Sequence, residues 1–267
     1  MQTQDRQQQN SHKRNVLITG GSSGIGTELV RQFAQAGDRV IFTYFSGEER
    51  AQELAEELKD YQVEYHLFEL GNLSSHRDLL SQLPQIDVLI NNAALGTKTV
   101  EKMSSIQEEQ DEIMLRVNAL GPLWLTEALL PKMEENGYGK IVFFSSVGGG
   151  ITQVPGFRLS DEMSKAAVAH LGRQMAVELS YSPVDVFTVC PGATDTPMFQ
   201  ASTTNKLTPE EKAAFLRRLP GRRMIEPIEI ARLCFNLCEP FSQVLRGTVI
   251  DASLGLGAYP GSIIDLS

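Results

Sequence analysis

The sequence is poor in cysteine and histidine, which limits both cross-linking and metal binding. Its 267 residues include three cysteines, too few for a disulfide framework and typical of a reducing compartment. Cys234 and Cys238 are spaced by one helical turn, as a pair of metal ligands would be, whereas Cys190 stands apart. The four histidines are scattered, so further ligands are missing and we expect no metal site.

Positive charge is also scarce. The chain carries 24 Lys and Arg residues against 33 Asp and Glu residues, which gives a formal net charge of −9. A surface that binds nucleic acid needs a cluster of positively charged side chains. We therefore expect no nucleic-acid partner, and the net charge itself favours solubility.

Long apolar runs are absent as well. No stretch reaches the roughly 18 apolar residues that a membrane span requires. Residues 1–14 are polar and glutamine-rich, without the apolar core of a signal peptide, so we expect a disordered tail. These absences predict a cytoplasmic protein that does not enter a membrane, with its ordered domain in residues 15–267.

Short apolar runs alternate along the chain with amphipathic helical patterns. This alternation is typical of βα units, and no linker or repeat divides the chain. The predicted fold class is α/β: a single doubly wound Rossmann-type domain with a parallel sheet flanked by helices. The predicted strands are Val16–Thr19, Arg39–Tyr44, Glu64–Glu69, Val88–Asn91, Lys140–Ser145, Asp185–Cys190 and Thr248–Asp251. The predicted helices are Ile25–Ala36, Gly47–Lys59, Ser75–Gln82, Ile106–Glu135, Glu162–Tyr181 and Pro227–Cys238.

The stretch VLITGGSSGIG, Val16 to Gly26, combines a buried strand, a glycine-rich turn and a helix start. Gly20, Gly24 and Gly26 allow a tight turn and a close approach to a pyrophosphate. The helix start supplies unpaired N–H groups and the positive end of its dipole. Because strand, turn and helix occur together, the stretch predicts a dinucleotide site.

Four further motifs follow in order. They are Asn91-Asn92-Ala93-Ala94, Val117-Asn118-Ala119, the strand Lys140–Ser145 that runs into Ser146, and the segment Pro191–Met198. Together with the T-G-x-x-x-G-x-G turn they resemble the short-chain dehydrogenase/reductase family, over about residues 15–257. The chain departs from that family at Ala94, where the family has glycine.

The resemblance implies a role for each matching residue. Asn118 would hold a water of the proton relay, Ser146 would orient the substrate carbonyl, and Lys165 would bind the nicotinamide ribose. The cofactor-binding residues would be Gly20, Ser22, Ser23, Gly24, Ile25, Gly26, Tyr44, Ser46, Asn72, Leu73, Asn92, Ala93, Lys165, Pro191, Gly192, Thr194 and Thr196. The resemblance also implies a lid over the substrate at about residues 197–223, and a homodimer or homotetramer formed through the two longest helices.

The residues after the second strand bear on the choice between NAD and NADP. An acidic residue at position 44 would hydrogen-bond the ribose 2′-OH and repel a 2′-phosphate, but the chain has Tyr44. The arginine that an NADP enzyme usually supplies next is Phe45 here. Ser46 offers a hydrogen bond without charge, and Arg50 lies in the first turn of the following predicted helix. We expect NADP in preference to NAD.

The chain lacks the tyrosine on which this family relies. In the family a tyrosine exchanges a proton with the substrate oxygen, and a lysine four residues later lowers the pKa of its hydroxyl. Lys165 matches that lysine, but Asp161 stands where the tyrosine belongs. The loop from Ser146 to position 161 is also two residues longer than is usual in the family.

Asp161 is an imperfect replacement. A carboxyl group with an ordinary pKa of about 3.9 is ionised at neutral pH, and Lys165 would lower that pKa further. It therefore suits the role of a base better than that of an acid, and a plain Asp161–Lys165 surface ion pair is the other interpretation. Ser146 or Ser160 could instead supply a hydroxyl, and Glu162 points about 100° away and is the weaker candidate.

Three functional hypotheses remain. The first is an NAD(P)-dependent oxidoreductase that acts on a small or medium carbonyl, alcohol or enone with an atypical proton donor. The alternatives are a non-redox dehydratase, isomerase or lyase on the same scaffold, and an inactive dinucleotide-binding subunit. The partner is a small-molecule substrate in the first two. The lid contains four arginines that either bind an anionic group on the substrate, are solvated or pair with neighbouring subunits: Arg217, Arg218, Arg222 and Arg223.

Overall fold

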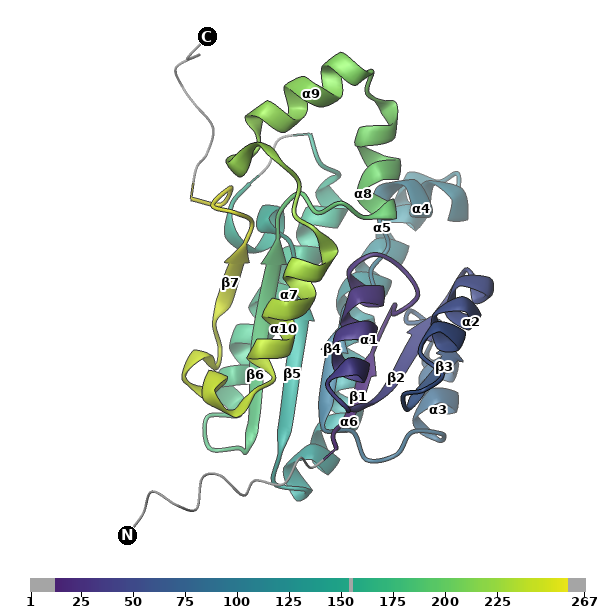
Figure 1. The fold of residues 1–267 in the computed structure, drawn as a ribbon, viewed down its shortest axis with the longest axis vertical. Helices are drawn as coiled ribbons and strands as arrows, with labels where there is room; N and C mark the ends of the chain where they lie inside the picture. The colour runs from purple at the N-terminus through teal and green to yellow at the C-terminus, as the bar shows by residue number, and fades with distance from the viewer. Residues whose placement is uncertain (1–12, 154–155, 259–267) are drawn as a thin grey trace.

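A single parallel sheet organises the chain. The computed structural model describes residues 13–153 and 156–258. Within these ranges seven strands pair in the order β3-β2-β1-β4-β5-β6-β7 (Figure 1). The strands are β1 (Asn15–Ile18), β2 (Arg39–Tyr44), β3 (Val63–Leu67), β4 (Val88–Asn91), β5 (Gly139–Phe144), β6 (Val184–Pro191) and β7 (Val249–Ala252). The predicted fold class is confirmed, and the seven predicted strands are found to within two residues at each end. The strand order reverses between β1 and β4, and doubly wound proteins bind ligands beyond the carboxyl ends of the strands at such a reversal.

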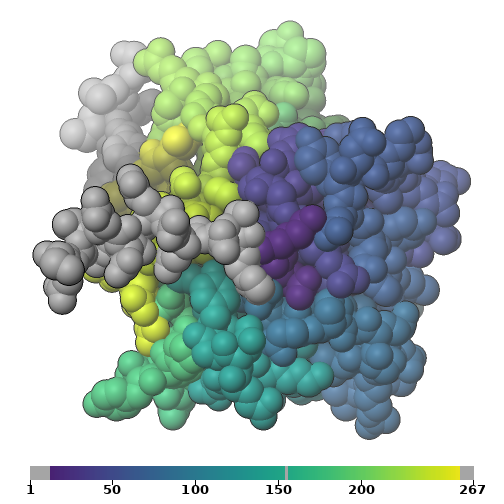
Figure 2. Space-filling model, turned by 60° about the horizontal axis from the view of Figure 1, so that its bottom comes forward, coloured from purple at the N-terminus to yellow at the C-terminus, as the bar shows by residue number. Residues whose placement is uncertain are grey.

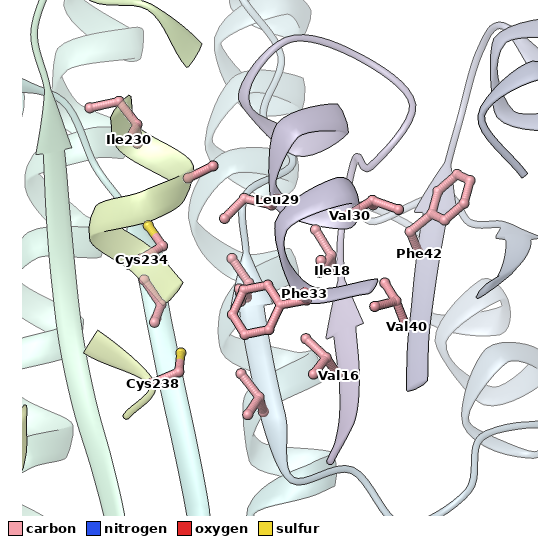
Figure 3. Packing of buried hydrophobic residues seen from close by; sticks show 14 of the residues in the cluster. Val16, Ile18, Leu29, Val30, Phe33, Val40, Phe42, Ile230, Cys234 and Cys238 are labelled. Carbon is pink, nitrogen blue, oxygen red and sulfur yellow. The ribbon is translucent and has the colours of Figure 1, made fainter. Parts of the chain in front are cut away.

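Helices cover both faces of this sheet. They are α1 (Ile25–Gln35), α2 (Glu48–Glu57), α3 (Leu73–Leu80), α4 (Thr97–Met103), α5 (Gln107–Leu115), α6 (Gly121–Glu135), α7 (Leu159–Glu178), α8 (Pro197–Ser202), α9 (Pro209–Arg218) and α10 (Pro227–Leu237). Successive strand residues point to opposite faces, so Val16 and Ile18 pack under α1 and α10, whereas Leu17 packs under α6 and α7. Figure 3 shows the first of these cores, in which Phe33 of α1 lies between Val16 of β1 and the α10 side.

The long helix predicted for Ile106–Glu135 is interrupted, and this prediction was wrong in detail. A π turn, Arg116–Leu120, separates α5 from α6. Pro122 has no N–H group, so it cannot donate the α-helical hydrogen bond to the carbonyl of Asn118. The N–H of Gly121 instead reaches back to the carbonyl of Arg116, one residue further than in an α-helix. The interruption places Asn118 in the widened turn.

The segment from α5 to α6 is long and apolar enough, by composition, to suit a membrane span as well. In the structure it is the layer beneath one face of the sheet. Leu125, Leu129 and Met133 are buried there among residues of β4, β5 and β6. That packing is typical of a core helix.

The predicted lid segment, about residues 197–223, is mostly helical. Its longer helix, α9, begins with a reciprocal capping box between Thr208 and Glu211. The helix α8 was not predicted. It is tied to α9 by the rings of Phe199 and Phe215, whose centroids lie 6.0 Å apart. Both helices lie beyond the carboxyl ends of the strands, at the top of Figure 1.

Arg14, which was assigned to the amino-terminal tail, contacts the folded domain. Residues 1–12 of the expected tail lie outside the described residues, but Arg14 is held in place. Its guanidinium pairs with Asp38 at 2.7 Å and with Glu239 at 3.1 Å, and it donates a hydrogen bond to the carbonyl of Cys238. Figure 2 shows the start of the described chain in purple between the blue and the yellow-green segments. Arg14 thus connects the loops that lie at the amino-terminal ends of the strands.

The contact between α7 and β6 depends on a glycine and gives the first testable prediction. A Cβ atom at position 172 would lie 2.0 Å from Oγ1 of Thr188. We expect Gly172→Ala to lower the free energy of unfolding by about 1–3 kcal/mol, because this overpacking outweighs the roughly 1 kcal/mol gain in helix propensity. Ala167→Ser, on the exposed face of the same helix, should stay within about 0.5 kcal/mol of wild type. Urea unfolding measures both, and equal stability of the two variants would contradict the packing argument.

Candidate active site

The glycine turn after β1 is shaped for a phosphate group. Gly20 has φ 69° and Gly24 has φ 57°, values in the left-handed region that favours glycine. Gly26 lies so close to the turn that a Cβ atom there would be 2.1 Å from the carbonyl oxygen of Gly20. The first backbone N–H groups of α1 therefore lie directly beside the turn, with no side chain between them. This is the backbone arrangement that binds the pyrophosphate of a dinucleotide.

Hydrogen bonds fasten the turn to the end of β4. Oγ1 of Thr19 accepts the N–H groups of Asn92 at 3.1 Å and Ala93 at 3.0 Å. The side-chain amide of Asn92 donates in turn to the carbonyl oxygens of Thr19 and Gly20. The structure thus brings Asn92 and Ala93 to the turn, and their contact with the cofactor stays a prediction. Thr19 was missed, although a hydroxyl residue between a buried strand and the first glycine was a signal for it.

The end of β2 forms the next part of the site. Gly21 donates its N–H to the carbonyl of Thr43 at 2.8 Å, so the turn also rests on this strand. Tyr44 is only 8% exposed, and burial together with the neighbouring Glu48 raises the pKa of its hydroxyl. Arg50 is solvent-exposed, but its guanidinium bends back over Gly47 and donates to the carbonyl of Ser46 at 3.2 Å. A positive charge therefore lies on the Ser46–Gly47 turn.

Two other predicted cofactor residues lie at the start of α3. The side chain of Asn72 caps this helix: its Oδ1 accepts the N–H of Ser74 at 3.0 Å, and its amide donates to Glu69 at 3.1 Å. Leu73 is about half exposed. The capping role was not predicted, and contact of Asn72 and Leu73 with an adenine ring stays a prediction.

The segment after β6 leads from the sheet into the lid. Gly192 packs against Ser253, and Thr194 is buried with its hydroxyl donating to the carbonyl of Gly192. Thr196 caps α8 and lies next to the glycine turn, because a Cβ atom on Gly24 would be 3.1 Å from its Cγ2. Thr196, one of the predicted cofactor-binding residues, and the turn predicted to bind pyrophosphate are therefore neighbours.

The side chain of Asn118 connects two parts of the site through hydrogen bonds. Its side-chain oxygen accepts the N–H of Leu95 at 2.7 Å, and its amide donates to the carbonyl of Leu95 at 3.0 Å and to the hydroxyl of Ser164 at 3.3 Å. The side chain thereby joins the loop after β4 to α7. Pro122 has no N–H to donate to the backbone carbonyl of Asn118, and the role of Asn118 in holding a water stays a prediction.

Ser146 and Lys165 both lie near the end of β5. Ser146 caps the π turn Val147–Ile151, and its Oγ accepts the N–H of Gly148 at 3.3 Å. The ammonium group of Lys165 donates to the carbonyl of Phe144 at 3.4 Å. Ser145, which was not predicted, donates its hydroxyl to the carbonyl of Lys165 at 2.8 Å. This bond fixes the lysine-bearing turn of α7 against the strand that carries Ser146.

Three consecutive glycines allow the π turn to lie flush against α7. A Cβ atom at Gly149 would be 2.6 Å from the Lys165 Cβ, and one at Gly150 would overlap the sulfur of Cys190. At Gly148 the space is filled by the carboxylate of Glu162, both oxygens of which lie within 2.6 Å of where a Cβ atom would be. The glycine run therefore determines how closely Ser146 approaches the helix of Lys165.

Asp161 behaves differently from the sequence-based expectation. Among the residues that the structure describes, the ion pairs within 4.0 Å do not include Asp161 and Lys165, so the surface ion pair is not formed. Burial raises the pKa of Asp161 and outweighs the attraction of Lys165 and Arg158, which lowers it. Burial also lowers the pKa of Lys165, against the attraction of Asp161 and Glu162. The expectation that Lys165 lowers the pKa of Asp161 is confirmed, but burial, which the sequence did not indicate, outweighs it and leaves the pKa raised.

Arg158 anchors the amino-terminal end of α7. It pairs with Asp111 of α5 at 2.5 Å, and it also donates to the side chains of Gln110 and Ser160. The hydroxyl of Ser160 donates to Asp111 at 2.5 Å. The hydroxyl of Ser160, one of the alternative proton donors, is thus already hydrogen-bonded to Arg158 and Asp111. These bonds hold the end of the lengthened loop where α7 begins.

The lid arginines do not act together. Arg223 forms a two-point ion pair with Glu229, at 2.6 Å and 2.7 Å. Arg217 and Arg218 are exposed in the last turn of α9, where positive charge complements the helix dipole. Arg222 is exposed with φ 56°. A role in binding an anionic substrate stays a prediction for these exposed arginines, and the ion pair of Arg223 speaks against such a role there.

Comparisons with known proteins agree with this arrangement. A family model described as short chain dehydrogenase matches residues 14–207. Oxidoreductase UcpA of Salmonella typhimurium is 31% identical over 250 residues, which cover 89% of this chain and 93% of UcpA. The 3-oxoacyl-[acyl-carrier-protein] reductase FabG of Aquifex aeolicus is 32% identical over 248 residues, which cover 90% and 96%. The structure of actinorhodin polyketide ketoreductase with NADPH superposes with a TM-score of 0.81 at 25% identity, over 92% of this chain and 98% of the ketoreductase.

The close approach of Gly26 to Gly20 gives the second prediction. A methyl group in Gly26→Ala must push α1 away from the turn, because it would meet a backbone carbonyl and not a flexible side chain. We expect the affinity for reduced nicotinamide dinucleotide to fall by more than about tenfold, or 1.4 kcal/mol, in a fluorescence titration. Gln35→Ala, exposed at the other end of α1, serves as control and should bind as wild type does. Unchanged affinity of Gly26→Ala would show that the turn does not hold the pyrophosphate.

Proposed function

The chain belongs to the short-chain dehydrogenase family and is an oxidoreductase, and on this premise we propose that it interconverts a small or medium carbonyl compound or enone and its reduced form, with Asp161 in place of the family tyrosine. The observation that carries the proposal is the convergence of Ser146, Lys165 and Asn118. Ser145 ties the turn of Lys165 to β5, and Ser164 ties Asn118 to α7. The glycine turn itself lies against Thr196, at the start of the lid helix α8.

The glycine turn fits a dinucleotide, and a nicotinamide cofactor would supply or accept a hydride when bound. The chain itself has to orient the substrate oxygen and to exchange a proton with it. Ser146, at the end of β5, would hold the oxygen. Asp161 would donate the proton, directly or through a water, because burial raises the pKa of its carboxyl towards the range in which it is an effective acid.

The names of the relatives favour a ketone as the oxidised substrate. FabG is a 3-oxoacyl reductase and the structural neighbour is a polyketide ketoreductase, so both reduce a keto group. The ketoreductase structure contains NADPH. For this chain we propose NADP in preference to NAD, supported by Arg50 on the Ser46–Gly47 turn and by the lack of an acidic residue at position 44.

We further propose a cytoplasmic homo-oligomer. Exposed apolar side chains follow one another on the outer surface of α7, where Leu159 is 80%, Met163 59% and Val177 66% exposed. An apolar helix face of this kind is typical of an interface with a second subunit. The measurement that tests this proposal is the molar mass in solution.

The proposed reaction is tested by turnover with reduced cofactor. We expect carbonyl-dependent oxidation of NADPH by the wild type, and a loss of about 10²–10⁴ in rate for Asp161→Asn, which cannot donate the proton. Asp60→Asn, at an exposed position beyond α2, is the control and should retain full activity. Binding of cofactor without turnover on any carbonyl would favour a non-redox enzyme or an inactive binding subunit, whereas full activity of Asp161→Asn would exclude Asp161 as the donor.

The cofactor preference is tested at Arg50. Arg50→Gln removes the positive charge from the Ser46–Gly47 turn, so NADPH should bind about tenfold more weakly, the loss expected for one charge-assisted phosphate contact. The affinity for NADH should not change, because NADH has no 2′-phosphate. Lys59→Gln, just after the other end of α2, is the matched control and should affect neither cofactor. An equal effect of Arg50→Gln on both cofactors would contradict the proposed role.

A further inference from the structure

His76 is a buried, titratable side chain that the proposed reaction does not use. It lies in α3, is only 4% exposed, and sits between the rings of Phe68 and Trp124. Both aromatic contacts are edge-on, with ring centroids 4.8 Å and 5.9 Å from that of His76. A histidine this deeply buried has lost most of its contact with water, so the hydrogen bonds of its ring determine which protonation state the site accepts.

Two hydrogen bonds connect His76 to the turn that precedes α3. Its Nε2 lies 2.8 Å from the carbonyl oxygen of Leu70, and its backbone N–H donates to the carbonyl of Asn72 at 3.2 Å. Because a carbonyl oxygen can only accept, the proton of the neutral ring is on Nε2. Nδ1 is buried and has no hydrogen-bond partner among the described residues. A second proton on the ring would therefore place a charge and an unpaired N–H group in an aromatic pocket.

The turn that His76 holds is packed tightly on its other side. A Cβ atom at Gly121, in the first turn of α6, would be 2.6 Å from the carbonyl oxygen of Leu70. Leu70 thus lies between the imidazole of His76 and α6. Asn72 and Leu73, which were predicted to contact the cofactor, follow almost directly in the chain. The positions of these two residues therefore depend on the bond between His76 and Leu70.

We propose that His76 is a positioning residue for the dinucleotide, which holds Asn72 and Leu73 in place while its ring is neutral and releases them when the ring takes up a second proton. His76 acts through these two residues and does not itself touch the cofactor. The consequence for binding rests on the proposed dinucleotide site, whereas the response of the turn to protonation does not.

The surroundings of His76 do not compensate a positive charge. Burial lowers the pKa of His76 from its ordinary value of 6.5, and it outweighs the bond to Leu70, which raises the pKa. The stabilisation by the neutral ring is therefore fully present above pH 6.5 and is lost as pH falls through the lower pKa of the folded protein. The charged side chains on the elements around the pocket are all exposed to solvent: Arg77 and Asp78 of α3, Glu69 before it, Arg116 of the π turn and Glu127 of α6.

Trp124, the only tryptophan of the chain, reports on this pocket in the cofactor-free protein. A protonated imidazole quenches the emission of a neighbouring indole, and departure of the ring would expose the indole to water. The wild type should therefore change its tryptophan emission in one reversible, one-proton step below pH 6.5 and before it unfolds. The step should be absent from His76→Gln, whose amide can donate to Leu70 but does not titrate, and present in the control His170→Gln, which is exposed on α7. Constant emission in the wild type until acid unfolding, or the same step in His76→Gln, would overturn the proposal.

Calorimetric titration with NAD measures the consequence for the cofactor. NAD is the suitable probe because it lacks a 2′-phosphate, and a phosphate monoester itself titrates near pH 6. Below the pH of the emission step, the affinity of the wild type should fall relative to that of His76→Gln by a factor approaching ten per pH unit, as one linked proton requires. His76→Phe keeps an aromatic ring but cannot donate to Leu70. It should bind NAD about three- to tenfold more weakly than the wild type already at pH 8, without the additional loss at lower pH.

The two measurements distinguish the possible failures. A wild type that shows the emission step but binds neither NAD nor NADPH overturns the proposed dinucleotide site, and with it the role of His76 for the cofactor. A wild type that binds NAD with the same pH dependence as His76→Gln overturns the positioning role of His76 and leaves the proposed function in place.

Discussion

The close contact of α7 with the ends of β5 and β6 decides where the candidate catalytic groups lie. Side chains at Gly149, Gly150 or Gly172 would push the helix away from the sheet, since each would meet an atom of α7, β5 or β6 within about 2.8 Å. Lys165 and Asp161 are carried by this helix, and Ser146 by the strand beneath it. Their mutual positions therefore follow from backbone packing, and the bond from Ser145 to the carbonyl of Lys165 fixes the register.

The cofactor half of the site depends on a different set of bonds. Thr19 and Asn92 join the glycine turn to β4 through four hydrogen bonds that involve backbone groups. Asn118 then continues the connection from the loop after β4 to α7. Two groups of hydrogen bonds, joined by residues 92–95 of the backbone, thus link the turn that would hold the pyrophosphate to the helix that would handle the proton, at the strand-order reversal between β1 and β4.

Sequence patterns predicted the sheet well because buried parallel strands are apolar on both faces and are bounded by polar turns. The glycine turn was predictable because only glycine readily adopts the left-handed backbone angles and the close backbone contacts that this turn requires. The π turn around Asn118 was not predicted, although Pro122 was its visible cause, because periodicity alone does not show where a proline shifts a hydrogen bond by one residue. The short helices α4 and α8 depend on tertiary contacts, such as that between Met198 and Gly96, which no local pattern encodes.

The pKa of Asp161 shows most clearly what sequence reasoning could not supply. The spacing of four residues from Lys165 correctly placed both groups on one helix, and attraction between them was a sound expectation. Burial proved the larger effect on the pKa of Asp161, and it arises from packing around the first turn of α7, which no local sequence pattern encodes. The segment after Ser146 begins with a π turn, in which the N–H of Thr152 donates to the carbonyl of Val147. Gly148 of this turn leaves room for the carboxylate of Glu162 in the first turn of α7, so the turn after Ser146 and the altered start of α7 pack directly against each other.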